Sequence, residues 1–244
     1  MTADFRLPLI TRSTSPAGHT LRDTDRNGPF REGPLGEGPF PDGPLRDRPL
    51  GSCPSTHRST PLAQLCDTLD AVFDACAHLS EPSSSTFFAR SMRVALAQAA
   101  ASPALLLPSQ REGSELAYRR HLLASDPHGR YAVAALVWLP GQASPVHAHH
   151  TWCGYAVLEG ALTETIFEWN GAQHCASATR TQARRGGAVS FVRGGRGGIH
   201  RLGNDSDAPA VSLHIYGVAG AQMATHVNDV VRAAGTPALA ERGA

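Results

Sequence analysis

The stretch that decides the fold runs from Gly141 to Gly160 and consists of GQASPVHAHHTWCGYAVLEG. It contains His147 and His149 at positions i and i+2, followed after three residues by Cys153. Successive side chains on a β-strand point to opposite faces, so these two imidazoles project from the same face. Imidazole nitrogens are common metal ligands, but two of them do not complete a site. The spacing therefore predicts a metal site that takes a further ligand from elsewhere in the chain.

A second glycine-rich run supplies that ligand. The segment GAVSFVRGGRGGIHRLGN spans residues 187–204 and contains His200 near its end. Together the two runs resemble the paired motifs of the cupin superfamily, with two departures. Cys153 stands where most cupins carry a metal-binding Glu, and Arg193 stands where Pro is usual. Their order and separation favour a metal site formed by the His-x-His pair and His200.

Composition excludes several kinds of chemistry. All 22 basic residues are Arg, and the absence of Lys excludes Schiff-base catalysis, pyridoxal phosphate attachment and a Walker-type phosphate loop. The net charge of +1 favours neither nucleic acid nor a membrane as a partner. The five Cys form no CxxC pair, and no secretory segment or apolar run of the ~20 residues of a membrane span is present. We therefore expect a soluble cytoplasmic protein, a monomer that binds neither nucleic acid nor membranes.

The N-terminal stretch has a distinct composition. From Gly28 a five-residue unit recurs as GPFRE, GPLGE, GPFPD, GPLRD and RPLGS. Pro in each unit interrupts regular structure, and one Phe or Leu per unit cannot form a core. Residues 1–58 are therefore predicted to be a disordered Pro/Gly-rich extension, and we favour a nonessential extension over the alternative of a partner-binding tail. Residues 59–235 are predicted to form a single domain, and residues 236–244 a flexible tail.

The predicted domain begins with helices and continues with strands. Thr60 followed by Pro61 suits a helix start, and apolar residues at helical spacing extend this helix to about Leu79. A second helix is predicted for Thr86–Ala101. Period-two segments then predict strands at Tyr131–Leu139, Gly154–Leu158, Leu162–Trp169, Ala188–Val192 and Val211–Val218.

The order of these elements predicts the fold class. Glu159-Gly160 suits a turn between two strands, and the interval 161–186 between the motifs has room for a strand pair and a loop. Helices followed by short antiparallel strands are typical of an α+β chain. We expect a helical N-terminal part followed by a cupin-type double-stranded antiparallel β-barrel of the jelly-roll kind.

The last predicted strand carries polar side chains on one face. In VSLHIYG, residues 211–217, the apolar side chains share one face, and Ser212, His214 and Tyr216 share the other. On an exposed face these three side chains would be solvated. In a barrel interior they would be costly unless they formed a hydrogen-bonded network.

Four blocks in order resemble the cysteine dioxygenase family, the thiol dioxygenases of the cupin superfamily. They are YRRHLL at 118–123, PVHAHHTWC at 145–153, IHRLGN at 199–204 and SLHIY at 212–216. The resemblance covers about residues 115 to 220. It implies that His147, His149 and His200 bind one Fe(II) through neutral imidazoles and leave positions open for a thiol substrate and O₂. The implied product is a sulfinic acid.

The resemblance also implies a substrate-binding residue. Arg120 matches the position that pairs with the substrate carboxylate, and a planar guanidinium suits this role. Arg119 and Arg130 are competing candidates, and Arg120 itself could be a solvated surface residue. In 3-mercaptopropionate dioxygenases a Gln tends to fill this position, so Arg120 favours L-cysteine.

Ser212, His214 and Tyr216 match a hydrogen-bonded row of the family. In that row Tyr216 would lie near the iron-bound atoms as a proton donor or an orienting group, with His214 setting its proton position and Ser212 orienting His214. Cys153 stands where some members form a thioether to the tyrosine. A crosslink to Tyr216 and an ordinary buried Cys both remain open. Ala148 replaces the family's common Asp, so the sequence does not show which residue orients the metal ligands by hydrogen bonding.

From these residues we predict a thiol dioxygenase that converts L-cysteine to cysteine sulfinic acid with Fe(II) and O₂. One alternative is a 3-mercaptopropionate dioxygenase that produces 3-sulfinopropionate. Another, from a different class, is a cupin that binds a metal or ligand without catalysis. Six arginines between residues 180 and 201 are interspersed with Gly and are expected to lie in a solvated loop.

Overall fold

The computed structural model describes residues 59–235, and the predictions for residues 1–58 and 236–244 lie outside this range. Helix α1 spans Pro61–Ala75 and helix α2 spans Thr86–Ala100. Each begins at a hydroxyl side chain that accepts a hydrogen bond from a first-turn backbone N–H, Thr60 for α1 and Ser85 for α2. Both helices are confirmed, although α1 ends short of the predicted boundary.

The strands form two five-stranded antiparallel sheets. The first has the order β1-β2-β9-β4-β7, with bounds Arg119–Ser125, Ala132–Trp138, Ala210–Tyr216, Cys153–Glu159 and Val189–Val192. The second has the order β10-β3-β8-β5-β6, with bounds Asn228–Val230, His147–His149, Gly195–Gly203, Ala161–Asn170 and Cys175–Arg185. The expected turn joins β4 to β5, where Gly160 has a φ of 69°, a conformation that favours glycine.

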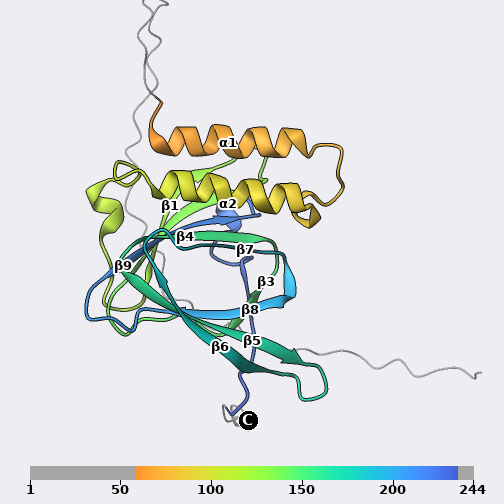
Figure 1. The fold of residues 1–244 in the computed structure, drawn as a ribbon, viewed down its shortest axis with the longest axis vertical. Coiled ribbons are helices and arrows are strands. Elements are labelled where there is room, and N and C mark those ends of the chain that lie inside the picture. The colour runs from red at the N-terminus through yellow and green to blue at the C-terminus, as the bar shows by residue number, and fades with distance from the viewer. Residues whose placement is uncertain (1–58, 236–244) are drawn as a thin grey trace, which may run out of the picture. The chain divides into compact units, whose positions relative to one another are not determined.

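The helices cover one face of the first sheet (Figure 1). Leu213 and Ile215 of β9 point to that face and are completely buried in a core with Leu69 and Phe88 of the helices. The opposite face of the same strand carries the polar residues and is buried as well. Burial on both faces explains why every residue of β9 is inaccessible, and it places the polar row in the interior.

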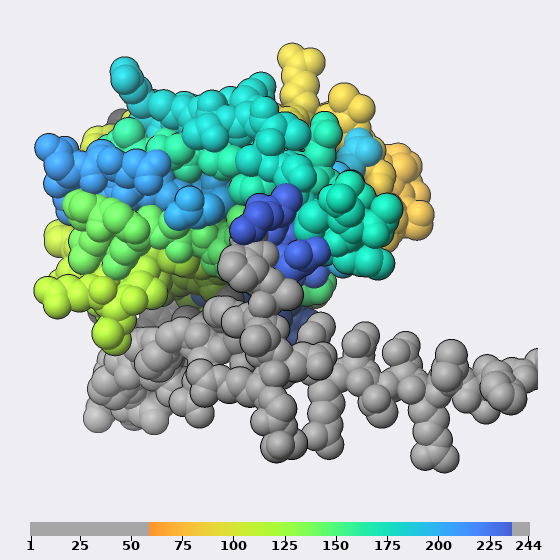
Figure 2. All heavy atoms as spheres, turned by 90° about the horizontal axis from the view of Figure 1, so that it is seen from below, coloured from red at the N-terminus to blue at the C-terminus, as the bar shows by residue number. Residues whose placement is uncertain are grey.

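The two sheets face each other, as Figure 1 shows, with the second sheet on the side away from the helices. Within residues 59–235 no strand pairing joins the two sheets, so they form a jelly-roll-like sandwich and not a closed barrel. The predicted α+β class and the cupin-type double sheet are confirmed. Seen from below (Figure 2), residues coloured green to blue make up most of the coloured surface, and the orange residues of α1 appear only at its edge.

The region predicted to be an arginine-rich loop is mostly strand. β6 contains Arg180, Arg184 and Arg185, and β8 contains Arg196 and Arg201. The prediction of a solvated loop was wrong because glycines in β8 are tolerated where the strand lies between β3 and β5, which supply its hydrogen bonds. None of the helices in residues 59–235 is both long and apolar enough to cross a membrane.

An ion-pair network fastens α1 to the turn between β1 and β2. Arg130 donates hydrogen bonds to the carboxylate of Asp126, and it also pairs with Asp70 of α1. The Tyr131 hydroxyl donates a further hydrogen bond to Asp70. Arg130 is therefore a structural residue between helix and sheet, and its side chain is engaged away from the histidine cluster.

Candidate metal centre

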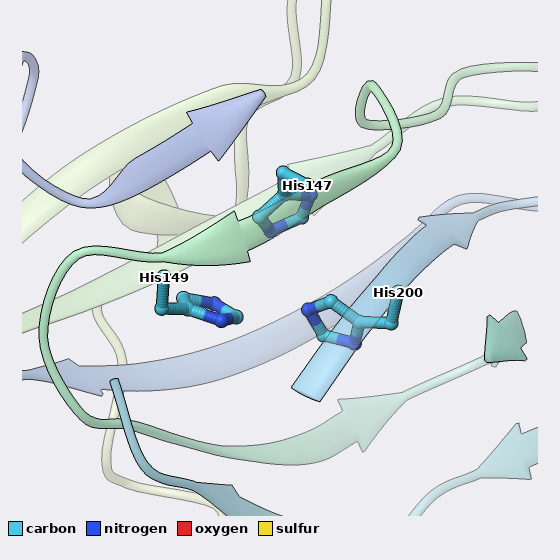
Figure 3. Close-up of side chains that lie close together, drawn as sticks. All are labelled: His147, His149 and His200. Carbon is cyan, nitrogen blue, oxygen red and sulfur yellow. The ribbon is translucent and has the colours of Figure 1, made fainter. Parts of the chain in front are cut away.

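Three histidines from two neighbouring strands meet on the inner face of the second sheet (Figure 3). His147 and His149 lie on β3, and His200 on β8 is the direct cross-strand partner of His147. Their candidate ligand atoms all lie within 4.8 Å of one another, and the three side chains are buried. Ring centroids are 4.8 to 5.1 Å apart. The structure thus brings together the three predicted ligands, although no motif spacing specifies this strand pairing.

Hydrogen bonds fix the orientation of two of these rings. Nδ1 of His147 lies 2.9 Å from the carbonyl oxygen of Pro145, and Nδ1 of His200 lies 2.9 Å from Oε1 of Glu164. Both partners are acceptors, so each Nδ1 carries a proton, and in the neutral ring Nε2 keeps its lone pair. Among residues 59–235, Nδ1 of His149 is a buried nitrogen without a hydrogen-bond partner.

The protonation of the cluster suits a metal ion. Burial, with the neighbouring His200, lowers the pKa of His147 to about 3. Burial, followed by the effect of His147, lowers the pKa of His149 well below its usual value. Neutral imidazoles with free Nε2 lone pairs are the ligand form, so the residues present fit a divalent metal.

The facing wall of the site is the polar row of β9. Nε1 of Trp138 donates a hydrogen bond of 2.9 Å to Oγ of Ser212, which lies 2.9 Å from Nε2 of His214. Indole N–H is only a donor, so the Ser212 oxygen accepts from Trp138 and still has its own proton and a second lone pair for His214. The hydrogen bond between Ser212 and His214 can therefore run in either direction, according to the tautomer of His214. Burial and the nearby Arg120 cation lower the pKa of His214, which keeps this imidazole neutral.

The predicted hydrogen-bonded row is only partly present. The Ser212–His214 link exists, but within residues 59–235 no hydrogen bond joins His214 to Tyr216. Their rings stack instead, with centroids 5.6 Å apart and planes at 26°. Side chains two apart on a strand project in parallel, which favours stacking over an in-plane hydrogen bond.

Arg120 lines the same cavity as the histidines. It lies on β1, its Nη2 donates a 2.9 Å hydrogen bond to the Tyr118 hydroxyl, and Tyr118 stacks on Trp138 with centroids 4.3 Å apart. Arg119 points elsewhere and lies 3.9 Å from Glu112 in a largely solvated pair. Of the three candidate arginines, Arg120 alone lines this cavity.

The cavity is small and enclosed mainly by the two inner sheet faces. Its empty volume, including the open mouth, is about 300 Å³. Because this figure includes open solvent, the enclosed space is smaller and suits only a molecule of a few heavy atoms. Leu136, Trp138 and Leu202 form its apolar part.

Cys153 and Tyr216 also line the cavity. Burial raises the pKa of the Cys153 thiol, and burial together with Cys153 raises the pKa of the Tyr216 phenol well above its usual value, while Arg120 acts in the opposite direction. Both groups are therefore protonated at neutral pH. Cys153 is a thiol rather than the thiolate that binds metals.

Glu164 is the main residue that the sequence-based prediction missed. It lies on β5 in the segment LTETIFEW, in the same strand phase as Leu162 and Ile166. A carboxylate between two apolar side chains on one strand face is the signal that could have identified it. Trp138 and Tyr118 were also missed, because an aromatic residue in a strand usually belongs to the core.

Two facing antiparallel sheets with a buried histidine cluster between them define the class, a metal-binding cupin. Residues 115–225 match the family model described as "Cysteine dioxygenase type I". Cysteine dioxygenase type 1 of Rattus norvegicus and that of Homo sapiens are each 30% identical to this chain over 102 residues, 41% of this chain and 50% of theirs. The resemblance to the cysteine dioxygenase family is thus confirmed for the strand-rich region. The chain spans about half the length of these curated relatives.

Matches to solved structures were also found, with low TM-scores. A Cupin 2 conserved barrel domain protein from Salinispora arenicola is 18% identical, with a TM-score of 0.32, over 41% of this chain and 74% of that one. A protein with a double-stranded beta-helix domain from Klebsiella pneumoniae is 16% identical, with a TM-score of 0.38, over 49% of this chain and 88% of that one.

Proposed function

We propose that this protein is a thiol dioxygenase that oxidises L-cysteine to cysteine sulfinic acid with Fe(II) and O₂. The observation that carries the proposal is the presence of the Arg120 cation and the histidine cluster in one small cavity. A small thiol with a carboxylate complements both features, because the sulfur can reach a metal while the carboxylate reaches the guanidinium. The four cysteines of residues 59–235 are free thiols, which suits the reducing environment of the cytoplasm.

His147, His149 and His200 would hold the iron. When bound, Fe(II) would supply a site for the substrate thiolate and for the activation of dioxygen. Because all three ligands are neutral, the ion would keep its full positive charge, which favours the thiolate form of the substrate.

Arg120 would bind and orient the substrate carboxylate. Its guanidinium is held by the Tyr118 hydroxyl, and the Tyr118 ring rests on Trp138. This support limits the positions that the guanidinium can take, which reduces the entropy lost on binding. Leu136 and Leu202 narrow the cavity and exclude water from the reacting atoms.

Tyr216 would hold a proton at its hydroxyl beside the substrate. Its raised pKa keeps the phenol protonated, so it can donate a hydrogen bond to a developing negative charge. His214 supports the ring by stacking, and Ser212 fixes the orientation of His214. This support differs from a proton relay along the row, because the His214–Tyr216 contact is between ring faces.

The test is oxygen consumption by Fe(II)-loaded protein with L-cysteine and, separately, with 3-mercaptopropionate. The proposal expects faster uptake with L-cysteine and a product that carries both atoms of ¹⁸O₂ on sulfur. The His147→Ala variant should lose both metal and uptake. Preference for 3-mercaptopropionate would retain the dioxygenase and refute the assignment of L-cysteine. No uptake with either thiol by metal-loaded protein would leave a non-catalytic metal-binding cupin.

A further inference from the structure

Glu164 is a buried carboxylate in contact with one of the candidate metal ligands. Its side chain is almost inaccessible, at 4%, and Oε1 lies 2.9 Å from Nδ1 of His200. Oε2 accepts a 2.9 Å hydrogen bond from Nε2 of Gln182 and lies 3.5 Å from Nε of Arg184. Burial of a carboxylate is costly unless such partners compensate. The interior therefore provides polar partners for both carboxylate oxygens of Glu164.

Two hydrogen bonds to the first sheet hold the side chain of Arg184 in place. Its Nε donates a 3.0 Å hydrogen bond to the Tyr155 hydroxyl, and its Nη2 donates a 2.9 Å hydrogen bond to the carbonyl of Val189. Tyr155 stacks on His214 with centroids 5.5 Å apart. The guanidinium next to Glu164 is thus attached to the first sheet, while Glu164 belongs to the second. The carboxylate is positioned by both sheets.

The location of Glu164 separates it from the candidate ligands themselves. The cluster that could hold a metal consists of His147, His149 and His200, and Glu164 lies behind His200 on the Nδ1 side. Cys153 occupies the motif position where most cupins have an acidic ligand, and it is a protonated thiol. Negative charge therefore reaches this centre through an imidazole and not by direct ligation.

We propose that Glu164 is a positioning residue of the metal centre. It accepts the Nδ1–H of His200, which holds the proton on Nδ1, aims Nε2 at the ion and limits rotation of the ring. Carboxylates that orient a ligating histidine in this way typically contribute a factor of about 10 to 100 to metal affinity. The inference rests on the metal-binding part of the proposed function and is independent of the substrate.

The first test is the affinity for Co(II) and Zn(II), measured by competition with a chelating indicator. Glu164→Ala is expected to weaken binding by roughly tenfold to a hundredfold. Glu164→Gln keeps the volume and an acceptor oxygen, so a smaller loss is expected. Glu168→Gln is the matched control, because Glu168 lies on the same strand but is exposed, and it should bind as wild type does. Wild-type affinity in both Glu164 variants overturns the proposal, and Glu164→Gln decides it if Glu164→Ala does not fold.

The second test reports the position of the proton. In metal-free, ¹⁵N-histidine-labelled protein, the imidazole signals of His200, assigned by their loss in His200→Ala, should show the proton on Nδ1. In Glu164→Ala the proton should move in part to Nε2, and in Glu168→Gln it should not. Loss of affinity with an unchanged proton position would indicate a general packing defect and overturn the proposal. If wild-type protein oxidises no thiol while both tests succeed, the proposed activity fails and the role of Glu164 stands.

Discussion

Cys153 and Tyr216 lie directly opposite each other on the antiparallel strands β4 and β9, and both line the cavity of the histidine cluster. Opposed residues in such a pair have Cβ atoms about 4.5 to 5.5 Å apart, which brings a thiol within reach of an aromatic ring. Both groups are protonated at neutral pH, as their raised pKa values require. A bond between the sulfur and the ring removes two hydrogen atoms, so its formation would need an oxidant whatever the protonation state of the thiol.

The first prediction concerns this pair. Aerobic incubation with Fe(II) and L-cysteine should form a thioether between Sγ of Cys153 and the ring of Tyr216. The thiol and the ring each lose one hydrogen, and dioxygen takes up the two electrons. Intact-mass and peptide analysis should then find a species lighter by two hydrogen atoms, absent from metal-free protein and from Cys153→Ser. If prolonged turnover leaves the peptides separate, Cys153 is an ordinary buried residue.

The second prediction concerns substrate binding. Replacing Arg120 by Gln removes the charged partner of the substrate carboxylate, so kcat/KM for L-cysteine should fall roughly tenfold to a hundredfold. Most of this loss should be an increase in KM, because the carboxylate contact is made in the ground state too. Metal content should be unchanged.

Arg119→Gln is the matched control for this variant. Arg119 is the preceding residue on β1 but is partly solvated, with its nearest carboxylate 3.9 Å away. Its replacement should leave KM within about twofold of wild type, since solvated surface pairs contribute little. Equal effects of the two replacements would contradict a specific role for Arg120.

The third prediction concerns the support of His214. Ser212→Ala removes the oxygen that accepts from Trp138 and bonds to His214, so two buried nitrogens lose a partner. Each unsatisfied group costs about 1–3 kcal/mol, so urea unfolding should show a clear loss of stability. The kcat should fall while metal content stays constant. Ser190→Ala on β7 is the control, and a kcat equal to that of Ser212→Ala would refute the role of Ser212.

The fourth prediction concerns stability against acid. The hydrogen bond from the Arg130 side chain, despite the opposing effect of burial, lowers the pKa of Asp126 from 3.8 to about 2. A carboxyl with a lowered pKa stabilises the fold above its unfolded pKa, and this contribution is lost as pH falls through the folded value. Asp126→Asn should therefore cost on the order of 2 kcal/mol at pH 7.

Urea unfolding of both proteins from pH 7 to pH 2 measures this effect. The difference in unfolding free energy between wild type and Asp126→Asn should decrease between about pH 4 and pH 2, because Asp126 becomes protonated there and its stabilising contribution is lost. Asp207→Asn, in an exposed loop, should show little difference from wild type at any pH. If the difference in unfolding free energy between wild type and Asp126→Asn does not change with pH, the ion-pair explanation is contradicted.

Local properties of the chain were predictable from the sequence. Both helices were predicted, the first from its capping residue and from apolar spacing over a few turns. Side chains alternate between the two faces of an extended chain because of its backbone geometry. This alternation places His147 and His149 on one face, and it does the same for Ser212, His214 and Tyr216. Motif order was enough to add His200 to the candidate ligands.

Contacts between residues that are distant in the sequence were decided by the tertiary structure alone. The pairing of β3 with β8 sets His147 opposite His200, and the sheet register places Cys153 opposite Tyr216. Glu164 reaches His200 because β5 pairs with the other edge of β8. Strand partner and register depend on the packing of whole sheet faces, and no short window of sequence contains that information. The histidine ligands were therefore visible in the sequence, whereas the contact of Glu164 with His200 and the stacking of Tyr216 on His214 required the fold.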